Sequence, residues 1–276
     1  MSVRIIVDST CDLTPDLRER VGVAHLTVHF GQTEYVDGID LTGHDFYEKL
    51  AASKDLPYTS QATPFAFGEL FEEAVTAGDE VVCVTVSAGL SGTCQSARIA
   101  AMDYPGKVFV VDSRNIAISS AILVEYALEL AGKGKSAQAI AEELGAVSGK
   151  VRLLAVVDTL EYLQRGGRVS KTVAIAGGLL AIKPLIGIVD GKVAMLGKAR
   201  GNKAANRLMN QEAEKLGIDW TKPVMLGYTG LDDSLLNKYL AECPSFWPEG
   251  TRAMLVSGVV GAHAGPGAVA VAFFAK

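Results

Sequence analysis

The sequence predicts an α/β protein of two domains. A parallel-sheet α/β domain is expected over residues 1–149, and an α+β domain with a mixed or antiparallel sheet over residues 150–276. In the first half, short apolar runs alternate with amphipathic segments, which is typical of a parallel sheet with helices on both faces. In the second half, Asp190-Gly191 separates two apolar runs with no helix between them. That pattern indicates a hairpin and therefore antiparallel strands.

The strands and helices of the first domain follow from periodicity and cap residues. Val3–Val7 is an apolar run that ends at Asp8-Ser9-Thr10, as a buried strand followed by a turn does. Residues 81–86 are almost continuously β-branched, which indicates a strand buried on both faces. By these criteria the strands lie at 3–7, 24–30, 81–86 and 108–111, and the helices at 42–52, 64–77, 91–102, 115–131 and 136–147.

The second domain follows a Gly- and Ser-containing stretch near Gly149. Its strands are expected at 151–157, 186–189, 192–197, 224–228, 253–260 and 268–274. Its helices are expected at 160–163, 171–182, 202–216 and 232–242. The segment 171–182 is apolar and contains two glycines, so we expect a closely packed helix there.

Composition excludes several classes of protein. With 276 residues, 49% hydrophobic and 21% charged, the chain is an ordinary globular one. The net charge of -5 leaves no basic surplus for nucleic acid. The four cysteines form no C-x-x-C pair, so we expect reduced thiols and no bound metal. No signal peptide precedes the first strand, and apolar stretches fall short of the roughly 20 residues that span a bilayer. We therefore expect a cytoplasmic protein with at most transient membrane contact.

Polar clusters stand where predicted strands end, which is where ligands bind in open α/β sheets. Asp8-Ser9-Thr10-Cys11-Asp12 supplies two carboxylates, too few for a metal site, and its Ser and Thr suit a helix cap. Thr59-Ser60-Gln61 offers neutral donors for a carboxylate, or forms a plain loop and cap. Ser87–Thr93 lies between a strand and a helix, and Ser91 there either binds an anion or caps the helix.

A glycine-rich turn and two arginines complete the candidate residues. The turn runs from Gly258 to Gly267 and carries His263, one of four histidines. Glycines let backbone approach a ligand closely. Arg168 follows Gly166-Gly167, and Arg200 precedes Gly201, so each stands at an element boundary where a guanidinium can reach an anion. Taken singly, each of these residues also has a purely structural interpretation.

As a set, these motifs resemble the DegV family of bacterial fatty-acid-binding proteins over essentially the whole chain. The resemblance rests on these pieces in this order: Val7-Asp8-Ser9-Thr10-Cys11-Asp12-Leu13, Thr59-Ser60-Gln61, Leu90-Ser91-Gly92-Thr93, Val111-Asp112-Ser113, Leu160-Glu161-Tyr162-Leu163, Gly166-Gly167-Arg168-Val169, Lys183-Pro184, Arg200-Gly201 and Gly261-Ala262-His263-Ala264-Gly265-Pro266-Gly267. One departure is that Ala62-Thr63-Pro64 follows Gln61, where the family usually has proline at once. Pro64 is expected to start the next helix.

The resemblance implies a DegV-like two-domain fold that binds a long-chain fatty acid between or within its domains. A chain of about 14 to 18 carbons gains about 0.8 kcal/mol for each buried methylene. The carboxylate would be held by Thr59, Ser60, Ser91 and His263, with Gly92, Thr93, Gly265 and Gly267 supporting the loops. Candidate walls for the acyl chain are the apolar segments 116–130 and 173–182, which also suit a plain core.

The resemblance also implies a partner, a separate fatty acid kinase that phosphorylates the bound carboxylate for phospholipid synthesis. Mg-ATP would belong to that kinase, since this chain has no phosphate-binding loop of its own. The fatty acid would then be the only ligand of this chain, which would be a carrier and not an enzyme. Arg168, Arg200 and His263 would assist the kinase at the mouth of the site.

Two alternatives remain open from the residues alone. One is a serine acyl hydrolase with Ser91 as nucleophile and His263 as base, although Thr93 replaces the last glycine of a nucleophile elbow. The other is a binding domain for a different small anionic ligand.

Overall fold

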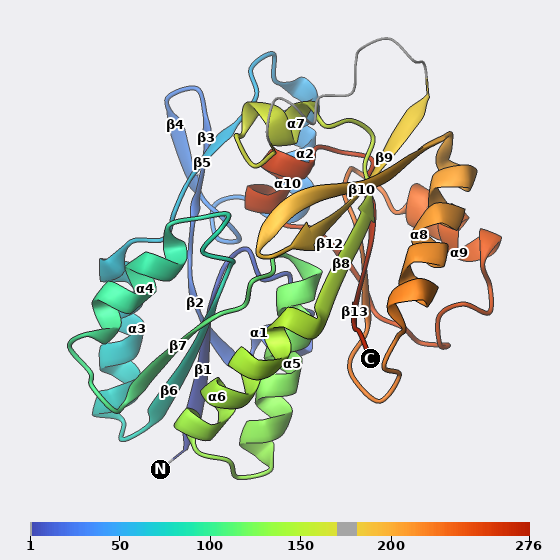
Figure 1. The fold of residues 1–276 in the computed structure, drawn as a ribbon. Coiled ribbons are helices and arrows are strands. Elements are labelled where there is room, and N and C mark those ends of the chain that lie inside the picture. Colours follow the sequence, from blue (N-terminus) through green and yellow to red (C-terminus); the bar gives the residue numbers. More distant parts are fainter. Residues whose placement is uncertain (1, 170–180) are drawn as a thin grey trace.

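The computed structural model describes residues 2–169 and 181–276. Figure 1 shows a parallel sheet on one side, a mixed sheet on the other, and α5 (Ile118–Gly132) between them. The predicted segment 171–182 lies outside the described residues except for its end, and Ile182 begins a strand. In the described parts of the chain, no helix is both long and apolar enough to cross a membrane.

The first sheet is parallel, with strand order β2-β1-β6-β7. Its strands alternate in the face that they present. Ile5, Val82 and Val84 pack on the side of α5 and α6, whereas Ile6 and Cys83 pack on the side of α3 and α4. The elements are β1 (Val3–Asp8), β2 (Val21–Ala24), β6 (Glu80–Thr85), β7 (Val108–Asp112), α3 (Pro64–Thr76), α4 (Thr93–Ala101) and α6 (Ala137–Val147). Helices on both faces confirm the predicted parallel α/β architecture.

A small antiparallel sheet, β4-β3-β5, projects from this half together with α2. Its elements are β3 (Thr27–Phe30), β4 (Thr33–Val36), β5 (Tyr58–Ser60) and α2 (Gly43–Ala52). The sequence predicted one strand over 24–30, and this was wrong. The chain leaves the first sheet after Ala24 because the backbone of Leu26 bonds elsewhere. Its N–H donates to the Ser9 hydroxyl, and its carbonyl accepts the Asp37 N–H. Short helical turns stand at α1 (Pro15–Arg18) and η1 (Ser148–Lys150).

The second sheet is mixed, with order β10-β9-β8-β13-β11-β12, and only β11 and β12 pair in parallel. Asp190, at a φ of +48°, and Gly191 form the turn between β9 and β10, which confirms the predicted hairpin. Helices α8 and α9 cover one face of this sheet. The elements are β8 (Val151–Val156), α7 (Glu161–Arg165), β9 (Ile182–Val189), β10 (Lys192–Arg200), α8 (Asn202–Leu216), β11 (Met225–Tyr228), α9 (Ser234–Glu242), β12 (Ala253–Leu255), α10 (Gly258–Ala264) and β13 (Val269–Phe274).

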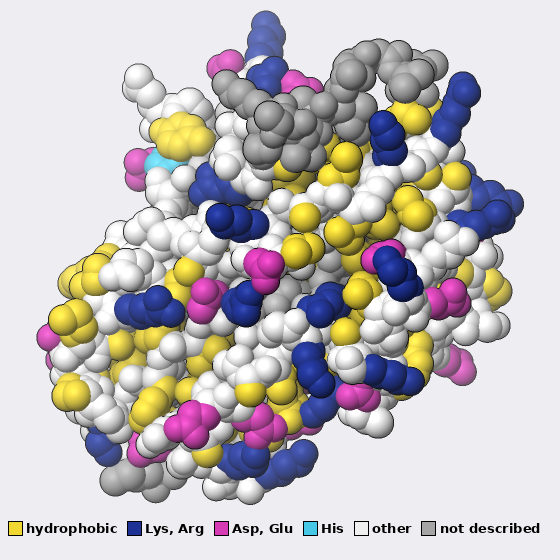
Figure 2. Space-filling model, viewed as in Figure 1, with side chains coloured by type: hydrophobic (Ala, Val, Ile, Leu, Met, Phe, Trp, Pro, Cys, Tyr) yellow, Lys and Arg dark blue, Asp and Glu magenta, His cyan; other side chains and the backbone are white. Residues whose placement is uncertain are grey.

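Helix α5 is buried on nearly every side because it packs against both sheets. Its side chains join one core with Ile5 and Val84 of the parallel sheet and with Ala270 and Ala272 of the mixed sheet. A helix that is apolar all round is typical of such a position. On the outer surface, Figure 2 shows acidic and basic side chains interspersed, with no large field of one sign on the face drawn.

The predicted strand over 253–260 is only three residues long, and α10 follows it. Gly258 and Gly261 lie against Phe46 and Tyr47 of α2, so that a Cβ at Gly261 would stand 2.6 Å from the Tyr47 hydroxyl. These glycines therefore allow a helix to pack closely rather than forming an open turn. The glycine-rich turn is confined to Gly265 and Gly267, whose φ angles are +71° and +82°.

Candidate functional site

An apolar cavity lies between the mixed sheet and the start of α5. Its empty volume is about 890 Å³, a figure that includes open solvent at its mouth. One face of the mixed sheet forms a wall of the cavity. Alternate residues along β8, β9 and β13, and at the positions next to their ends, point into it: Leu153, Ala155 and Val157; Ile186 and Ile188; Ala268 and Ala270. The opposite face of the same strands packs against α8 and α9. Because successive side chains of a strand point to opposite faces, one set of residues packs in the core and the next set lines the cavity.

Short segments at the ends of helices and strands form the remaining walls. Ile116, Ala117 and Ile118 contribute the start of α5, so only the first part of the predicted wall 116–130 lines the cavity. Val86 and Leu90 come from the loop after β6. Nearly all of this lining is hydrocarbon, which suits a long alkyl chain.

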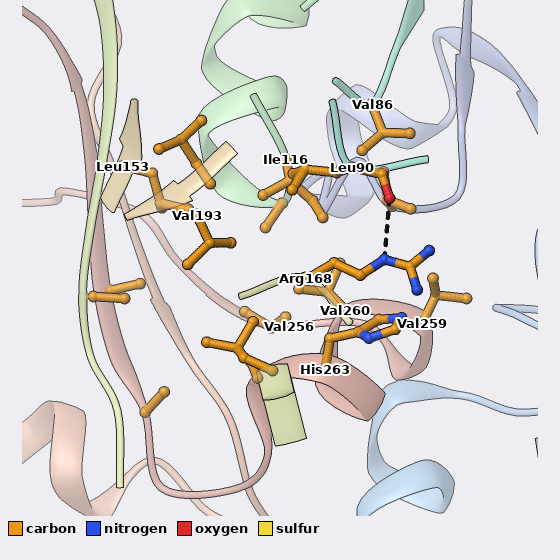
Figure 3. Close-up of a pocket in the computed structure, with 18 of the residues that line it drawn as sticks. Val86, Leu90, Ile116, Leu153, Arg168, Val193, Val256, Val259, Val260 and His263 are labelled. Carbon is orange, nitrogen blue, oxygen red and sulfur yellow. Dashed lines mark hydrogen bonds between the residues drawn. The ribbon is translucent and has the colours of Figure 1, made fainter. Parts of the chain in front are cut away.

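Four polar residues of the lining lie near one another at one end of the cavity. Thr59, Ser91, Arg168 and His263 all line it. Figure 3 shows Arg168 and His263 side by side, with Leu153 and Val193 at the opposite end. The structure thus brings four predicted site residues together from distant parts of the chain.

Thr59 and His263 form the central contact of this polar end. Thr59 Oγ1 lies 2.9 Å from His263 Nε2, within hydrogen-bonding distance. β5 positions Thr59 toward the cavity, while its neighbour Ser60 bonds His29 Nε2 at 2.8 Å. Successive residues of a strand point to opposite sides, which explains why Ser60 does not line the cavity.

His263 is a neutral imidazole near pH 7. Burial lowers its pKa to about 4, and the nearby Arg168 charge acts in the same direction. The ring is also fixed on its other side, because a Cβ at Gly166 would stand 2.2 Å from His263 Nδ1. His263 therefore offers a hydrogen bond at this site and not a positive charge.

Arg168 supplies the positive charge at this end. Its Nε donates to the Leu90 carbonyl at 3.1 Å, and its Nη1 donates to the Gly166 carbonyl at 2.6 Å. Backbone carbonyls hold the guanidinium in place, and no carboxylate within residues 2–169 and 181–276 forms an ion pair with it. The charge remains available to an anionic ligand.

Ser91 precedes α4 and bonds within its own turn. Its Oγ lies 2.9 Å from Thr93 Oγ1 and accepts the Thr93 N–H at 3.2 Å. The hydrogen bonds of the described residues pair Ser91 with Thr93 and His263 with Thr59, rather than with each other. The arrangement therefore lacks the nucleophile–base contact that the hydrolase alternative requires.

Gly92 joins the Ser91 turn to the end of β5. A Cβ at Gly92 would lie 2.1 Å from Gln61 Oε1, and Gln61 Nε2 donates to Ser96 Oγ at 3.0 Å. This docking places Thr59 and Ser91 on the same cavity. Gly92, Thr93, Gly265 and Gly267 do not line the cavity, and their predicted support of the loops stays a prediction.

Two buried carboxyl groups hold the start of α10, which carries His263. Asp12 Oδ1 accepts the Ser257 N–H at 2.8 Å. The Asp37 carboxylate lies against the same helix start, since a Cβ at Gly258 would stand 3.2 Å from Asp37 Oδ1. Burial raises the pKa of Asp12 to about 8 and that of Asp37 to about 6. The predicted structural use of the Asp8–Asp12 cluster thus extends to α10, with Asp37 as a partner that no sequence signal identified.

Arg200 lies away from this group. It is the last residue of β10, it is exposed, and it pairs with Ile182 across the hairpin. Arg200 does not line the cavity. Its predicted role at the mouth stays a prediction.

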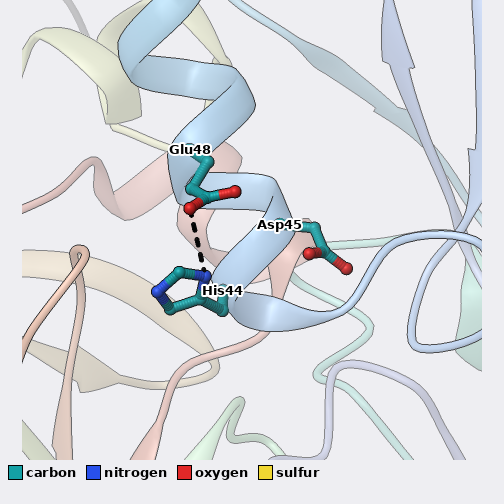
Figure 4. A group of neighbouring side chains, drawn as sticks. All are labelled: His44, Asp45 and Glu48. Atoms are coloured by element: carbon teal, nitrogen blue, oxygen red, sulfur yellow. Dashed lines mark ion pairs between the residues drawn. The ribbon is translucent and has the colours of Figure 1, made fainter.

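A separate group on α2 brings together possible metal ligands. Figure 4 shows His44, Asp45 and Glu48, whose ligand atoms lie within 4.8 Å of one another. All three are exposed, and Asp45 already forms a capping box with Thr42 at the start of α2. The capping box explains Asp45 without a metal.

Sequence reasoning missed the sheet residues that form most of the cavity wall. Leu153, Ala155 and Val157 alternate along β8, and this alternation was the available signal. Both faces of the strand are apolar, however, so alternation of polarity does not reveal which face lines a cavity. Thr10, from the first polar cluster of the sequence, also lines the cavity, and so does Thr229, for which the sequence carried no signal.

The fold and this cavity define a class of α/β proteins in which a parallel sheet and a mixed sheet enclose an apolar space with a polar end. Comparison with known proteins gives the family. The model described as "Uncharacterised protein, DegV family" matches residues 2–276, and the chain belongs to that family. A DegV domain-containing protein of Caldanaerobacter subterraneus is 34% identical over 279 residues, which covers 99% of each chain.

Solved structures of family members share the whole fold. A DegV family protein from Thermus thermophilus, described by its fatty acid binding, superposes with a TM-score of 0.89 at 29% identity over 100% of both chains. A stearic acid-binding protein from Eubacterium ventriosum gives a TM-score of 0.86 at 27% identity, covering 100% of this chain and 99% of the other.

Proposed function

We propose that this protein binds a long-chain fatty acid, with the acyl chain in the apolar cavity and the carboxylate at Thr59, Ser91, Arg168 and His263. The observation that carries the proposal is the cavity itself, which is hydrocarbon along its length and polar at one end. Two relatives above 25% identity, from Thermus thermophilus and Eubacterium ventriosum, are described as fatty-acid-binding. The shared fold supports the same ligand class here.

The energetics favour such a ligand. Burying methylenes contributes about 0.8 kcal/mol each, so the tail supplies most of the affinity. An unpaired buried carboxylate is costly, and the Arg168 charge with the Thr59 and Ser91 hydroxyls provides partners for it. Neutral His263 keeps Thr59 in place without adding a second charge.

We further propose that the protein is a carrier that presents the carboxylate to a separate ATP-dependent fatty acid kinase. Transfer of a phosphoryl group from ATP to the carboxylate forms an acyl phosphate and ADP. In this proposal the kinase binds Mg-ATP, and Arg200, exposed at the end of β10, contacts the kinase or its phosphate groups. Residues on both sides of the predicted boundary near residue 149 line the cavity, which supports a ligand held between two domains.

Binding is tested by extracting lipid from freshly purified protein and by mass spectrometry of the intact complex. A stoichiometric long-chain acid is expected, with reloading after delipidation. A protein that remains empty when offered palmitate and oleate would contradict the proposal and favour another small anionic ligand at Arg168.

A further inference from the structure

The mixed sheet splits at the end of the cavity opposite His263. Strands β8 and β9 pair from Val156↔Leu185 to Leu154↔Gly187, and their pairing ends there. β9 continues instead with β10, where Ile188 pairs with Val193 and Val189 with Lys192. Gly187 allows the last close approach, since a Cβ there would stand 2.8 Å from the Leu153 carbonyl oxygen. Beyond it a gap opens between β8 and β9.

A second cleft, lined by charged and polar side chains as well as apolar ones, occupies this gap. Its empty volume is about 870 Å³ including its opening, and the β9–β10 turn and α8 form part of its rim. Arg114 lines it and pairs with Asp190 at 3.0 Å, and Arg152 lines it beside the start of β8. The buried Asn115 Oδ1, also in this lining, has no hydrogen-bond partner. A methyl group in this open cleft keeps more contact with water than in the apolar cavity and therefore gains less from burial.

Among the residues that the structure describes, only Leu153 and Ile188 line both the apolar cavity and the second cleft. They stand at the first position past the end of the β8–β9 pairing, and each is 9% exposed. Figure 3 places Leu153 at the opposite end of the cavity from His263. A hydrocarbon chain that starts at His263 and fills the cavity therefore ends against this pair.

We propose that Leu153 and Ile188 form a stop that sets the longest acyl chain the cavity accommodates, with the split between β8 and β9 behind it. The proposal rests on the proposed fatty-acid binding. Methylenes on the cavity side of the stop gain affinity by burial. Methylenes beyond it enter the second, more open and more polar cleft and gain less. Truncating the pair joins the two spaces and moves this limit to longer chains.

The test compares dissociation constants for saturated fatty acids from about 12 to about 22 carbons. For the wild-type protein, affinity is expected to rise about fourfold per methylene up to one length and then to level off or fall. In the double variant Leu153→Ala/Ile188→Ala, the chain length at which affinity stops rising is expected to increase by about two methylenes. Ile188→Val removes one methylene, is expected to fold readily, and shifts the limit by about one.

Leu185→Ala is the matched control. Leu185 lies on β9, is as apolar as the stop residues, and packs on the α8–α9 side without lining either space. It is expected to lower stability and leave the length limit unchanged. Profiles of the stop variants that superimpose on the wild type, or an equal shift in Leu185→Ala, would overturn the proposal. Wild-type protein that binds no acid of any length would instead contradict the proposed function, so the two failures are distinguishable.

Discussion

Thr59 Oγ1 and His263 Nε2 lie 2.9 Å apart although 204 residues separate them in the sequence. The contact joins β5, in the first half of the chain, to α10, near its end. The polar end of the cavity therefore forms only when both halves are folded and packed together. Head-group binding should respond to changes at either partner.

Thr59→Val is predicted to weaken fatty-acid binding by about tenfold or more. The substitution keeps the shape of the side chain and removes the hydroxyl, and a hydrogen bond to a charged group contributes about 1.5–3 kcal/mol. Ser60→Ala is the control, because that hydroxyl bonds His29 away from the cavity. Titration of delipidated protein with a fluorescent fatty acid measures both. Equal affinities for the two variants would contradict the placement of the carboxylate.

Gly166→Ala is predicted to displace the His263 ring. The added methyl would stand 2.2 Å from Nδ1 and 3.1 Å from the Tyr162 carbonyl oxygen. Loss of fatty-acid affinity with a native circular dichroism spectrum is expected. Gly68→Ala, inside α3 with nothing within 4 Å of the new methyl, should bind normally and be more stable by about 1 kcal/mol. Normal binding by Gly166→Ala would show that the ring position is unimportant.

The ionisation of Asp12 is predicted to make the free energy of unfolding depend on pH. Burial raises its pKa in the folded state to about 8, so the folded protein keeps a proton that the unfolded chain has released. The free energy of unfolding should therefore fall as pH rises from 6.5 to 8, by at most about 1.4 kcal/mol per pH unit. His263, with a folded pKa of about 4, contributes the opposite slope only between pH 4 and its ordinary value of 6.5.

Asp12→Asn tests this assignment, because asparagine mimics the protonated carboxyl and still accepts the Ser257 N–H. Urea denaturation at several pH values should show a flatter dependence between pH 6.5 and 8 than in the wild type. An unchanged slope would mean that another group releases the proton.

Arg200→Ala is predicted to reduce kinase-dependent acyl-phosphate formation by more than it reduces fatty-acid binding. Arg200 is exposed and lies outside the cavity lining, so its loss removes no contact with the tail. Arg207→Ala removes an exposed arginine on α8 and serves as the charge-matched control. Parallel loss of binding and phosphorylation in Arg200→Ala would indicate that the residue shapes the pocket instead.

Much of the architecture was predictable because it depends on local periodicity. The strand Glu80–Thr85 and the helices at 64–76 and 202–216 follow from runs of apolar residues and their caps. The errors fall where tertiary packing decides. Ala24 and Thr27 belong to different sheets, and Gly258–Ala264 is helical because its glycines fit against α2.

The candidate site was predictable in part for the same reason. Polar residues at the boundaries of elements, such as Ser91 and Arg168, stand out from an apolar background. The walls do not, since Leu153 looks like any core residue until the split of β8 from β9 places it beside a cavity. Asp37 lies against the start of α10, which is more than 200 residues away in the sequence, and no local pattern indicates that contact.

The most direct test of the account is native mass spectrometry of the purified protein beside analysis of its extracted lipid. The account predicts one long-chain fatty acid per chain, lost on delipidation and restored by added acid in the wild type but much less in Thr59→Val. A chain that carries no fatty acid and takes up none when it is offered would contradict it.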